Sequence, residues 1–239
     1  MANPQRLRYR SRVTEAFPFL DILNAIPGVR AGWVERVAGL TITGDRDEAM
    51  NALRPHHAEA VSHFASQPTA SWWRAEQIHG TAVAMVPGVP RITAPDGLPV
   101  VPGVDGLITR EPGVTLAIYV ADCGAIWLAD RGSGAIGLLH SGKKGTQGHI
   151  LDVALGEMAR HFGSRPADVV AVLGPCVRLP DYDVDFAGEI GAQAGRAGIG
   201  KFIDCGLNTA ADLGRFYSYR KEMGKTGRMM ALITRDFSP

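Results

Sequence analysis

The feature that most constrains the fold is a series of short apolar segments, each closed by glycine, proline or aspartate, between residues 71 and 142. Segments such as VTLAIYVAD (114–122) and AIWLAD (125–130) are typical of β-strands joined by tight turns. A further strand, AIGLLHSG (135–142), leads into a stretch with apolar residues at helical spacing that Gly163 closes. Strand pairs together with a strand–helix–strand unit predict an α/β (α+β) fold with mixed sheets flanked by helices.

The rest of the chain adds elements of both kinds. Helical spacing of apolar residues predicts a helix within residues 45–67, and a short, glycine-weakened helix is predicted over residues 186–198. Buried strands are predicted within residues 167–177 and 226–236. With 46% apolar residues among 239, the chain can bury one sizeable core. We therefore expect a single domain over residues 1–239.

Charge and cysteine content exclude several classes of protein. The 25 basic and 24 acidic residues form no basic stripe, which argues against nucleic-acid binding. No segment approaches the roughly 20 apolar residues that span a bilayer, and no apolar leader follows the arginines at residues 6–12. We expect a cytoplasmic protein, monomeric or homodimeric, that uses neither membrane nor nucleic acid. Its three cysteines are too few for a disulfide framework and are expected to be thiols.

Three residues with metal-ligating side chains lie at expected strand ends or turns: His79 in EQIHG, Cys123 after Asp122, and His140 before Ser141. Two imidazoles and one thiolate suit Zn²⁺ and leave a fourth tetrahedral position open, as in a catalytic site. Cys123 with His140 as its base would equally suit a nucleophilic hydrolase. The spacing is also compatible with buried histidines that have no role in chemistry, so three interpretations remain open.

Charged residues near these positions are further candidates. Asp122 could orient a histidine or form a surface ion pair, and strand alternation places it opposite Cys123 unless the backbone turns there. Asp105 is equally compatible with a turn and with a site. Lys143 and Lys144 lie between glycines at a strand-to-helix junction, which favours an anion such as phosphate but is also an ordinary surface turn.

The segment FYSYRKEMGKTGR (216–228) combines aromatic and basic side chains. Tyr217, Tyr219, Arg220 and Arg228 could stack on a flat ring and pair with phosphate or carboxylate. The same pattern would also suit a hairpin with packed aromatic residues.

Six ordered segments resemble the laccase-domain family, also called the multicopper polyphenol oxidase or peptidoglycan editing factor family, of purine nucleoside phosphorylase type. They are EQIHG, VDGLIT, ADC, LLHSGKKG, LGPCV and FYSYRKEMGKTGRMMALI. The resemblance implies a fold grouped with a deamidating bacterial toxin as cysteine hydrolases. It also implies phosphorolysis of adenosine, inosine, guanosine and methylthioadenosine, and deamination of adenosine.

The resemblance further implies a Zn²⁺ site with His79, Cys123 and His140 as ligands. The older family name implies copper-dependent oxidation of phenols, but the histidine content of this chain makes copper the less favoured ion. Gln77, Lys144 and Arg220 are expected to bind the nucleoside and phosphate, and Asp122 is the candidate for moving a proton. The alternatives are a Cys–His amide hydrolase acting on a cell-wall precursor and a catalytically weakened relative that binds a metabolite.

The chain departs from the family pattern at three places, one of which is a shortened segment between Val184 and Phe216. Where the family usually has His-Ala-Gly-Trp-Arg-Gly, residues 140–145 are His-Ser-Gly-Lys-Lys-Gly, so two point charges replace a planar guanidinium and an aromatic ring. The early Thr-Arg-x-Gly-Gly stretch of the family is not recognisable in residues 20–45. A conventional multicopper laccase is excluded, because its copper centres need more histidines than the seven present here, and no His-x-His pair occurs.

Overall fold

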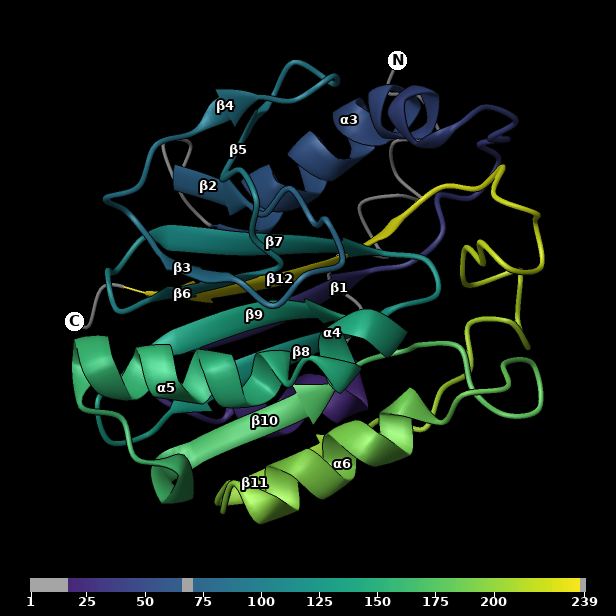
Figure 1. Ribbon diagram of the computed structural model, residues 1–239. Coiled ribbons are helices and arrows are strands. Elements are labelled where there is room, and N and C mark those ends of the chain that lie inside the picture. Colours follow the sequence, from purple (N-terminus) through teal and green to yellow (C-terminus); the bar gives the residue numbers. More distant parts are fainter. Residues whose placement is uncertain (1–16, 66–70, 237–239) are drawn as a thin grey trace.

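The structure is a computed structural model, which describes residues 17–65 and 71–236. The arginines at residues 6–12 lie outside the described residues. The described chain forms four layers (Figure 1): helix α3 (Arg46–Phe64), a four-stranded sheet, a six-stranded sheet, and a layer with helices α5 (Ile150–Phe162) and α6 (Phe186–Arg196). The expected α/β fold with mixed sheets flanked by helices is therefore confirmed.

The four-stranded sheet has the order β1-β12-β7-β2. Its strands are β1 (Val29–Val34), β12 (Met229–Arg235), β7 (Val114–Val120) and β2 (Ser71–Arg74). The β1–β12 and β12–β7 pairs are antiparallel, whereas β2 pairs with β7 in parallel. The sheet thus joins segments from both ends of the described chain.

The six-stranded sheet has the order β11-β10-β8-β9-β6-β3. Its strands are β11 (Lys201–Asp204), β10 (Val169–Leu173), β8 (Gly124–Asp130), β9 (Ile136–Ser141), β6 (Gly106–Thr109) and β3 (Val83–Met85). The central pairs are antiparallel and the two outer pairs, β10–β11 and β6–β3, are parallel.

Short elements complete the described chain. They are η1 (Pro18–Leu20), α2 (Asp21–Asn24), the small hairpin of β4 (Ile92–Thr93) and β5 (Pro99–Val100), α4 (Lys143–Gln147) and η2 (Pro166–Asp168). None of the described helices combines the length and the apolar character that crossing a bilayer requires.

The central strands are apolar throughout because both faces of each sheet are covered. In β8, Trp127 packs into the core between the two sheets, while its neighbours Ile126 and Leu128 pack into the core beneath α5 and α6. In β7, Ile118 faces the inter-sheet core and Tyr119 faces the α3 side. Because side chains alternate along a strand, each strand contributes to the core between the sheets and to a second core on its outer face, which gives three cores among the described residues.

The sequence-based elements agree with the structure over most of the chain. The helix ended by Gly163 is α5, and Gly163 takes the left-handed conformation (φ 69°) that favours glycine at a helix C-terminus. Strands β1 and β11 have no counterpart among the sequence-based predictions. Segment β1 reads VRAGWV and alternates between buried and partly buried residues over its first five positions, but it is short and contains glycine, so its extended form depends strongly on pairing with β12.

Candidate metal centre and cavity

Three loop or strand-end positions bring His79, Cys123 and His140 together. His79 lies between β2 and β3, Cys123 lies in the connection from β7 to β8, and His140 is near the end of β9. Their ligand atoms all lie within 4.8 Å of one another, and the two imidazole rings meet edge to face with centroids 4.9 Å apart. Among the described residues, this group has the composition and the geometry to hold a metal ion.

Asp105, which directly precedes β6, holds both histidines in place. Its carboxylate oxygen Oδ1 accepts hydrogen bonds from His140 Nδ1 at 2.8 Å and from the backbone N–H of His79 at 2.9 Å, and Oδ2 accepts one from Gly80 N–H at 2.7 Å. Because Nδ1 of His140 is engaged in this way, Nε2 is the nitrogen left for a metal. Asp105 is fully buried and therefore belongs to the site rather than to an ordinary turn.

Electrostatics favour the ligating form of Cys123. Burial alone would raise the pKa of its thiol, but the charge of His140 and hydrogen bonds from His140 and His79 lower that pKa to about 6. Burial would likewise lower the pKa of His140, whereas the Cys123 thiolate and the Asp105 carboxylate raise it to about 9. Burial would raise the pKa of Asp105, yet its hydrogen bonds with His140 and Gly80 hold it below its usual range. The thiolate is the form that binds metals and acts as a nucleophile.

The backbone of Gly142 passes close to the sulfur of Cys123. A Cβ atom at this position would lie 2.4 Å from Cys123 Sγ, which is far inside van der Waals contact. Gly142 also precedes α4, so the turn from β9 into α4 passes directly beside the thiol. The glycine is therefore required for space, since its φ of −110° is accessible to any residue.

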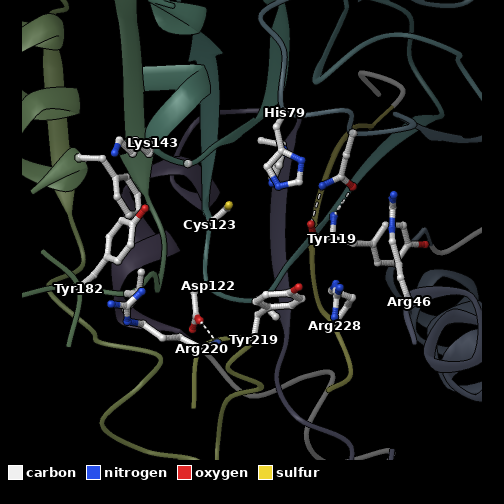
Figure 2. Close-up of a pocket in the computed structure, with 16 residues that line it drawn as sticks. Arg46, His79, Tyr119, Asp122, Cys123, Lys143, Tyr182, Tyr219, Arg220 and Arg228 are labelled. Atoms are coloured by element: carbon white, nitrogen blue, oxygen red, sulfur yellow. Dashed lines mark hydrogen bonds between the residues drawn. The ribbon is translucent and has the colours of Figure 1, made fainter. Parts of the chain in front are cut away.

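The metal group opens into a cavity of about 610 Å³, a size typical of small-molecule sites. Figure 2 shows the lining side chains, with Lys143, Tyr182 and Arg220 toward one end and Arg46, Tyr119 and Arg228 toward the other. The lining residues are Arg46, Gln77, His79, Tyr119, Ala121, Asp122, Cys123, His140, Gly142, Lys143, Val177, Tyr182, Phe186, Tyr219, Arg220 and Arg228. The cavity thus combines aromatic surface with a marked excess of positive charge.

Asp122 lines the cavity next to Cys123 because both residues lie in the turn between β7 and β8, beyond the strict alternation of a strand. Its Oδ1 accepts a hydrogen bond from Thr209 Oγ1 at 2.6 Å, and its Oδ2 accepts one from the backbone N–H of Arg220 at 2.8 Å. The guanidinium of Arg220 in turn stacks over the Tyr182 ring, 4.9 Å from its centroid. Asp122 therefore holds the 216–228 segment against the metal group.

Of the three residues expected to bind substrate, two line the cavity and one does not. Gln77 lines the cavity, but its side-chain amide is hydrogen-bonded to the backbone of Tyr119 on both sides. Arg220 lines the cavity, whereas Lys144 is exposed on α4 and is not among the lining residues; Lys143 occupies the wall instead. Lys143 faces the cavity and Lys144 does not because successive side chains of an α-helix point about 100° apart.

Several lining residues, among them Arg46 and Tyr182, are not among the candidates that the sequence predicts. Arg46 begins α3 and Tyr182 precedes α6, both far along the chain from the metal group. Neither belongs to a local motif, so no signal in the sequence points to them. Of the aromatic residues singled out in the segment 216–228, Tyr219 lines the cavity, while Tyr217 is fully buried and its hydroxyl accepts a hydrogen bond from Val37 N–H.

Comparisons with known proteins identify relatives of this chain. The family model described as multi-copper polyphenol oxidoreductase laccase matches residues 27–191 and 181–236. The chain is 34% identical over 236 residues to a purine nucleoside phosphorylase of Deinococcus radiodurans, with 85% of this chain and 86% of that protein covered. It is 29% identical to the purine nucleoside phosphorylase YlmD of Geobacillus stearothermophilus, with 82% of each covered.

A solved structure shows the same fold. The hypothetical protein YfiH of Bacillus licheniformis superposes with a TM-score of 0.74 at 25% identity, covering 87% of this chain and 93% of that one. Sequence and fold comparisons thus agree over most of both chains. The chain belongs to the multi-copper polyphenol oxidoreductase laccase family.

Proposed function

We propose that the protein is a zinc-dependent purine nucleoside phosphorylase. The observation that carries this proposal is the cavity, in which a His–Cys–His metal group lies beside cationic and aromatic side chains. Cationic groups suit phosphate, and aromatic rings suit a purine base. The relatives named purine nucleoside phosphorylase support an enzyme of this kind.

The donor set fits zinc. His79, Cys123 and His140 would supply two nitrogens and one sulfur, which leaves a coordination position open toward the cavity. When bound, the ion would supply Lewis acidity at this point of the cavity. Copper is the less favoured ion, because the chain lacks the histidines of a multicopper oxidase.

In the proposed reaction, inorganic phosphate is held at the end of the cavity lined by Lys143 and Arg220. Lys144, exposed on the same turn of α4, adds positive charge outside the cavity wall and attracts the anion. A phosphate oxygen forms a bond to C1′ of the ribose as the bond from C1′ to the base nitrogen breaks, and the base takes up a proton as it leaves. Tyr219 offers a ring on which the purine can stack, and Gln77 keeps the cavity wall at Tyr119 in place.

Adenosine deamination is a second proposed activity. It is favoured by Asp122, a carboxylate on the cavity wall that two hydrogen bonds orient beside Cys123. A carboxylate in this place can accept and return a proton during attack of water on the base. An amide hydrolase with Cys123 as nucleophile is the competing hypothesis, because the pKa values of Cys123 and His140 also suit a thiolate–imidazolium pair.

Metal analysis and product analysis on one set of proteins test these proposals. Wild type should contain about one zinc per chain, and Cys123→Ala should lose it because a site with three protein ligands depends on each of them. Cys205→Ala is the matched control, since Cys205 lies in the loop after β11 and does not line the cavity. Chromatography should show adenine from adenosine only when phosphate is added, and inosine without phosphate if deamination occurs.

Two results would contradict the proposal. Zinc-loaded wild type that forms no product from adenosine, inosine or guanosine, with or without phosphate, would reject the nucleoside enzyme. Metal-free protein that hydrolyses an amide substrate and loses this activity in Cys123→Ala would support the Cys–His hydrolase instead.

A further inference from the structure

The α3 end of the cavity carries positive charge that the proposed phosphorolysis does not use. Arg46 is the first residue of α3, and Arg228 directly precedes β12. Both line the cavity, and Figure 2 shows them on the opposite side of Tyr219 from Lys143 and Arg220. The lining therefore has two cationic ends with the metal group between them.

Neither arginine at this end is neutralised by the protein. The guanidinium of Arg46 donates to the backbone carbonyl of Glu76 at 2.8 Å, and that of Arg228 donates to the carbonyls of Thr226 and Gly227 at 3.0 and 2.8 Å. Within residues 17–65 and 71–236, neither forms an ion pair with a carboxylate. Burial lowers the pKa of Arg228, and the nearby charge of Arg46 lowers it further.

Two other arginines of the protein are paired with carboxylates. Buried Arg74 is paired with both oxygens of Asp96, and Arg178 is paired with Asp204. Arg228 is half-buried without a carboxylate partner, which is unfavourable for a cation, and the charge of the exposed Arg46 adds repulsion that lowers the pKa of Arg228. An anion bound between Arg46 and Arg228 would remove both costs.

The cavity contains no carboxylate that could serve as this anion. Asp122 is the one acidic residue among the lining residues, and its two oxygens are already held by Thr209 and the Arg220 backbone. Glu76 directs a carboxylate oxygen to the N–H of Gly103, 2.7 Å away, and does not line this cavity. The anion must therefore come with the ligand.

We propose that Arg46 and Arg228 bind a phosphate group carried by the substrate itself, so that the preferred substrates are purine nucleoside 5′-monophosphates. This inference rests on the proposed phosphorolysis, which places inorganic phosphate at the other end, beside Lys143 and Arg220. Two guanidinium groups can each donate paired N–H groups to phosphate oxygens. A nucleotide with its base fits a cavity of about 610 Å³.

The reaction with a nucleotide keeps the same bond changes. An oxygen of inorganic phosphate forms the bond to C1′, the bond between C1′ and the base nitrogen breaks with its electron pair going to the base, and the base takes up one proton. The products are the free purine and ribose 1,5-bisphosphate. The 5′-phosphate remains between Arg46 and Arg228 throughout and is not transferred.

The kinetic test compares adenosine with AMP as substrate, with inorganic phosphate varied. The ratio of kcat/KM for AMP to that for adenosine should exceed about tenfold in wild type, the discrimination expected from a charge-assisted phosphate contact. Arg46→Gln should bring this ratio toward one, and Arg46→Lys should restore part of it. Arg196→Gln, an exposed arginine on α6 that pairs with Glu189, is the matched control and should leave the ratio unchanged.

Calorimetry tests the subsite without turnover. Zinc-loaded wild type in phosphate-free buffer should bind AMP at least about tenfold more tightly than adenosine, and Arg46→Gln should lose this preference. Equal affinity for AMP and adenosine would overturn the inference while leaving nucleoside phosphorolysis intact. The inference would also be overturned if Arg46→Gln raised the KM for inorganic phosphate and left the ratio of kcat/KM for AMP to that for adenosine unchanged. Arg46 would then bind the co-substrate.

Failure of the proposed function gives a different result. If no base is released from either adenosine or AMP, phosphorolysis is rejected. The calorimetric comparison then still decides the subsite: a preference for AMP that Arg46→Gln removes supports it, and its absence overturns it.

Discussion

At the scale of single residues, the metal group depends on a buried carboxylate that is not itself one of the grouped ligands. Asp105 contacts the His140 ring, the His79 backbone and the Gly80 backbone at once. It thereby connects the loop that carries His79 to the strand that carries His140. Such a residue sets the orientation of two ligands and the charge beside one of them.

Asp105→Asn should weaken zinc binding by about 10- to 100-fold, the effect typical of changing a residue that orients metal ligands. The asparagine side chain carries no negative charge beside His140. It also has one oxygen instead of two, so it cannot accept all three of the hydrogen bonds that Asp105 accepts. Competition with a chelating dye measures this affinity.

Asp130→Asn is the matched control, because Asp130 is a buried carboxylate that accepts hydrogen bonds in the turn after β8 and does not line the cavity. It should lower stability and leave zinc affinity unchanged. Equal zinc affinity in wild type and Asp105→Asn would show that Asp105 does not position the ligands.

At the scale of elements, the junction of β9 and α4 sets the geometry around the thiol. β9 ends at Ser141, Gly142 follows, and α4 begins at Lys143. The Ser141 hydroxyl is hydrogen-bonded to that of Thr146 at 2.9 Å, which ties the short helix back to the strand. This tight turn allows His140 and Lys143 to reach the same cavity from neighbouring elements.

Gly142→Ala should displace Cys123, because the new methyl group would lie 2.4 Å from its sulfur. We expect a destabilisation of about 1–3 kcal/mol, typical of an overpacked site, together with loss of zinc measured by elemental analysis. Gly156→Ala on the exposed face of α5 is the control, since a Cβ there has no heavy atom within 4 Å. It should stabilise the protein by about 0.5–1 kcal/mol through helix propensity and retain zinc. Full zinc occupancy in Gly142→Ala would contradict the packing argument.

At the scale of the whole molecule, the site exists only where the two sheets meet. Cys123 follows a strand of the four-stranded sheet, and His140 lies on a strand of the six-stranded sheet. The sheets are joined by their shared core and by Trp127, whose indole N–H donates to the carbonyl of Leu232 at 2.8 Å. Loss of sheet packing would therefore separate the cavity wall at Tyr119 and Arg228 from the metal group, while the pairing of β8 with β9 keeps Cys123 beside His140.

Global stability should fall in acid partly through His57, a buried residue of α3 whose ring packs against that of Tyr119. Burial lowers the pKa of His57 from 6.5 to about 3. Below pH 6.5 the unfolded chain therefore binds a proton that the folded chain excludes, so this contribution is complete above pH 6.5 and is lost as the pH falls toward 3. The expected slope approaches about 1.4 kcal/mol per pH unit.

His57→Phe should remove this contribution, so that the loss of stability between pH 7 and pH 5 is smaller than in wild type by about 2 kcal/mol. Urea unfolding at the two pH values measures the difference. Met50→Ala, a buried change on the same helix, should lower stability at both pH values by about 2–5 kcal/mol and keep the wild-type difference. An unchanged pH dependence in His57→Phe would show that His57 does not contribute.

Features that depend on local pattern can be predicted from the sequence. Apolar runs closed by turn residues identify β7, β8 and β9, and helical spacing with a terminal glycine identifies α5. Such patterns arise because strands and helices repeat the direction of their side chains with different periods, so the spacing of buried apolar residues differs between them. The same approach singled out His79, Cys123 and His140, since chemically distinctive side chains stand out at strand ends even when their neighbours in space are unknown.

Only the tertiary structure decided which distant residues share the cavity. Arg46 and Arg228 are 182 positions apart in the sequence, and Asp105 meets His79 and His140 through the pairing of β6 with β9 and β3. Lys143 rather than Lys144 lines the wall because the orientation of α4 selects one of two adjacent lysines. Contacts of this kind arise from the packing of whole sheets and helices, which no local period in the chain encodes.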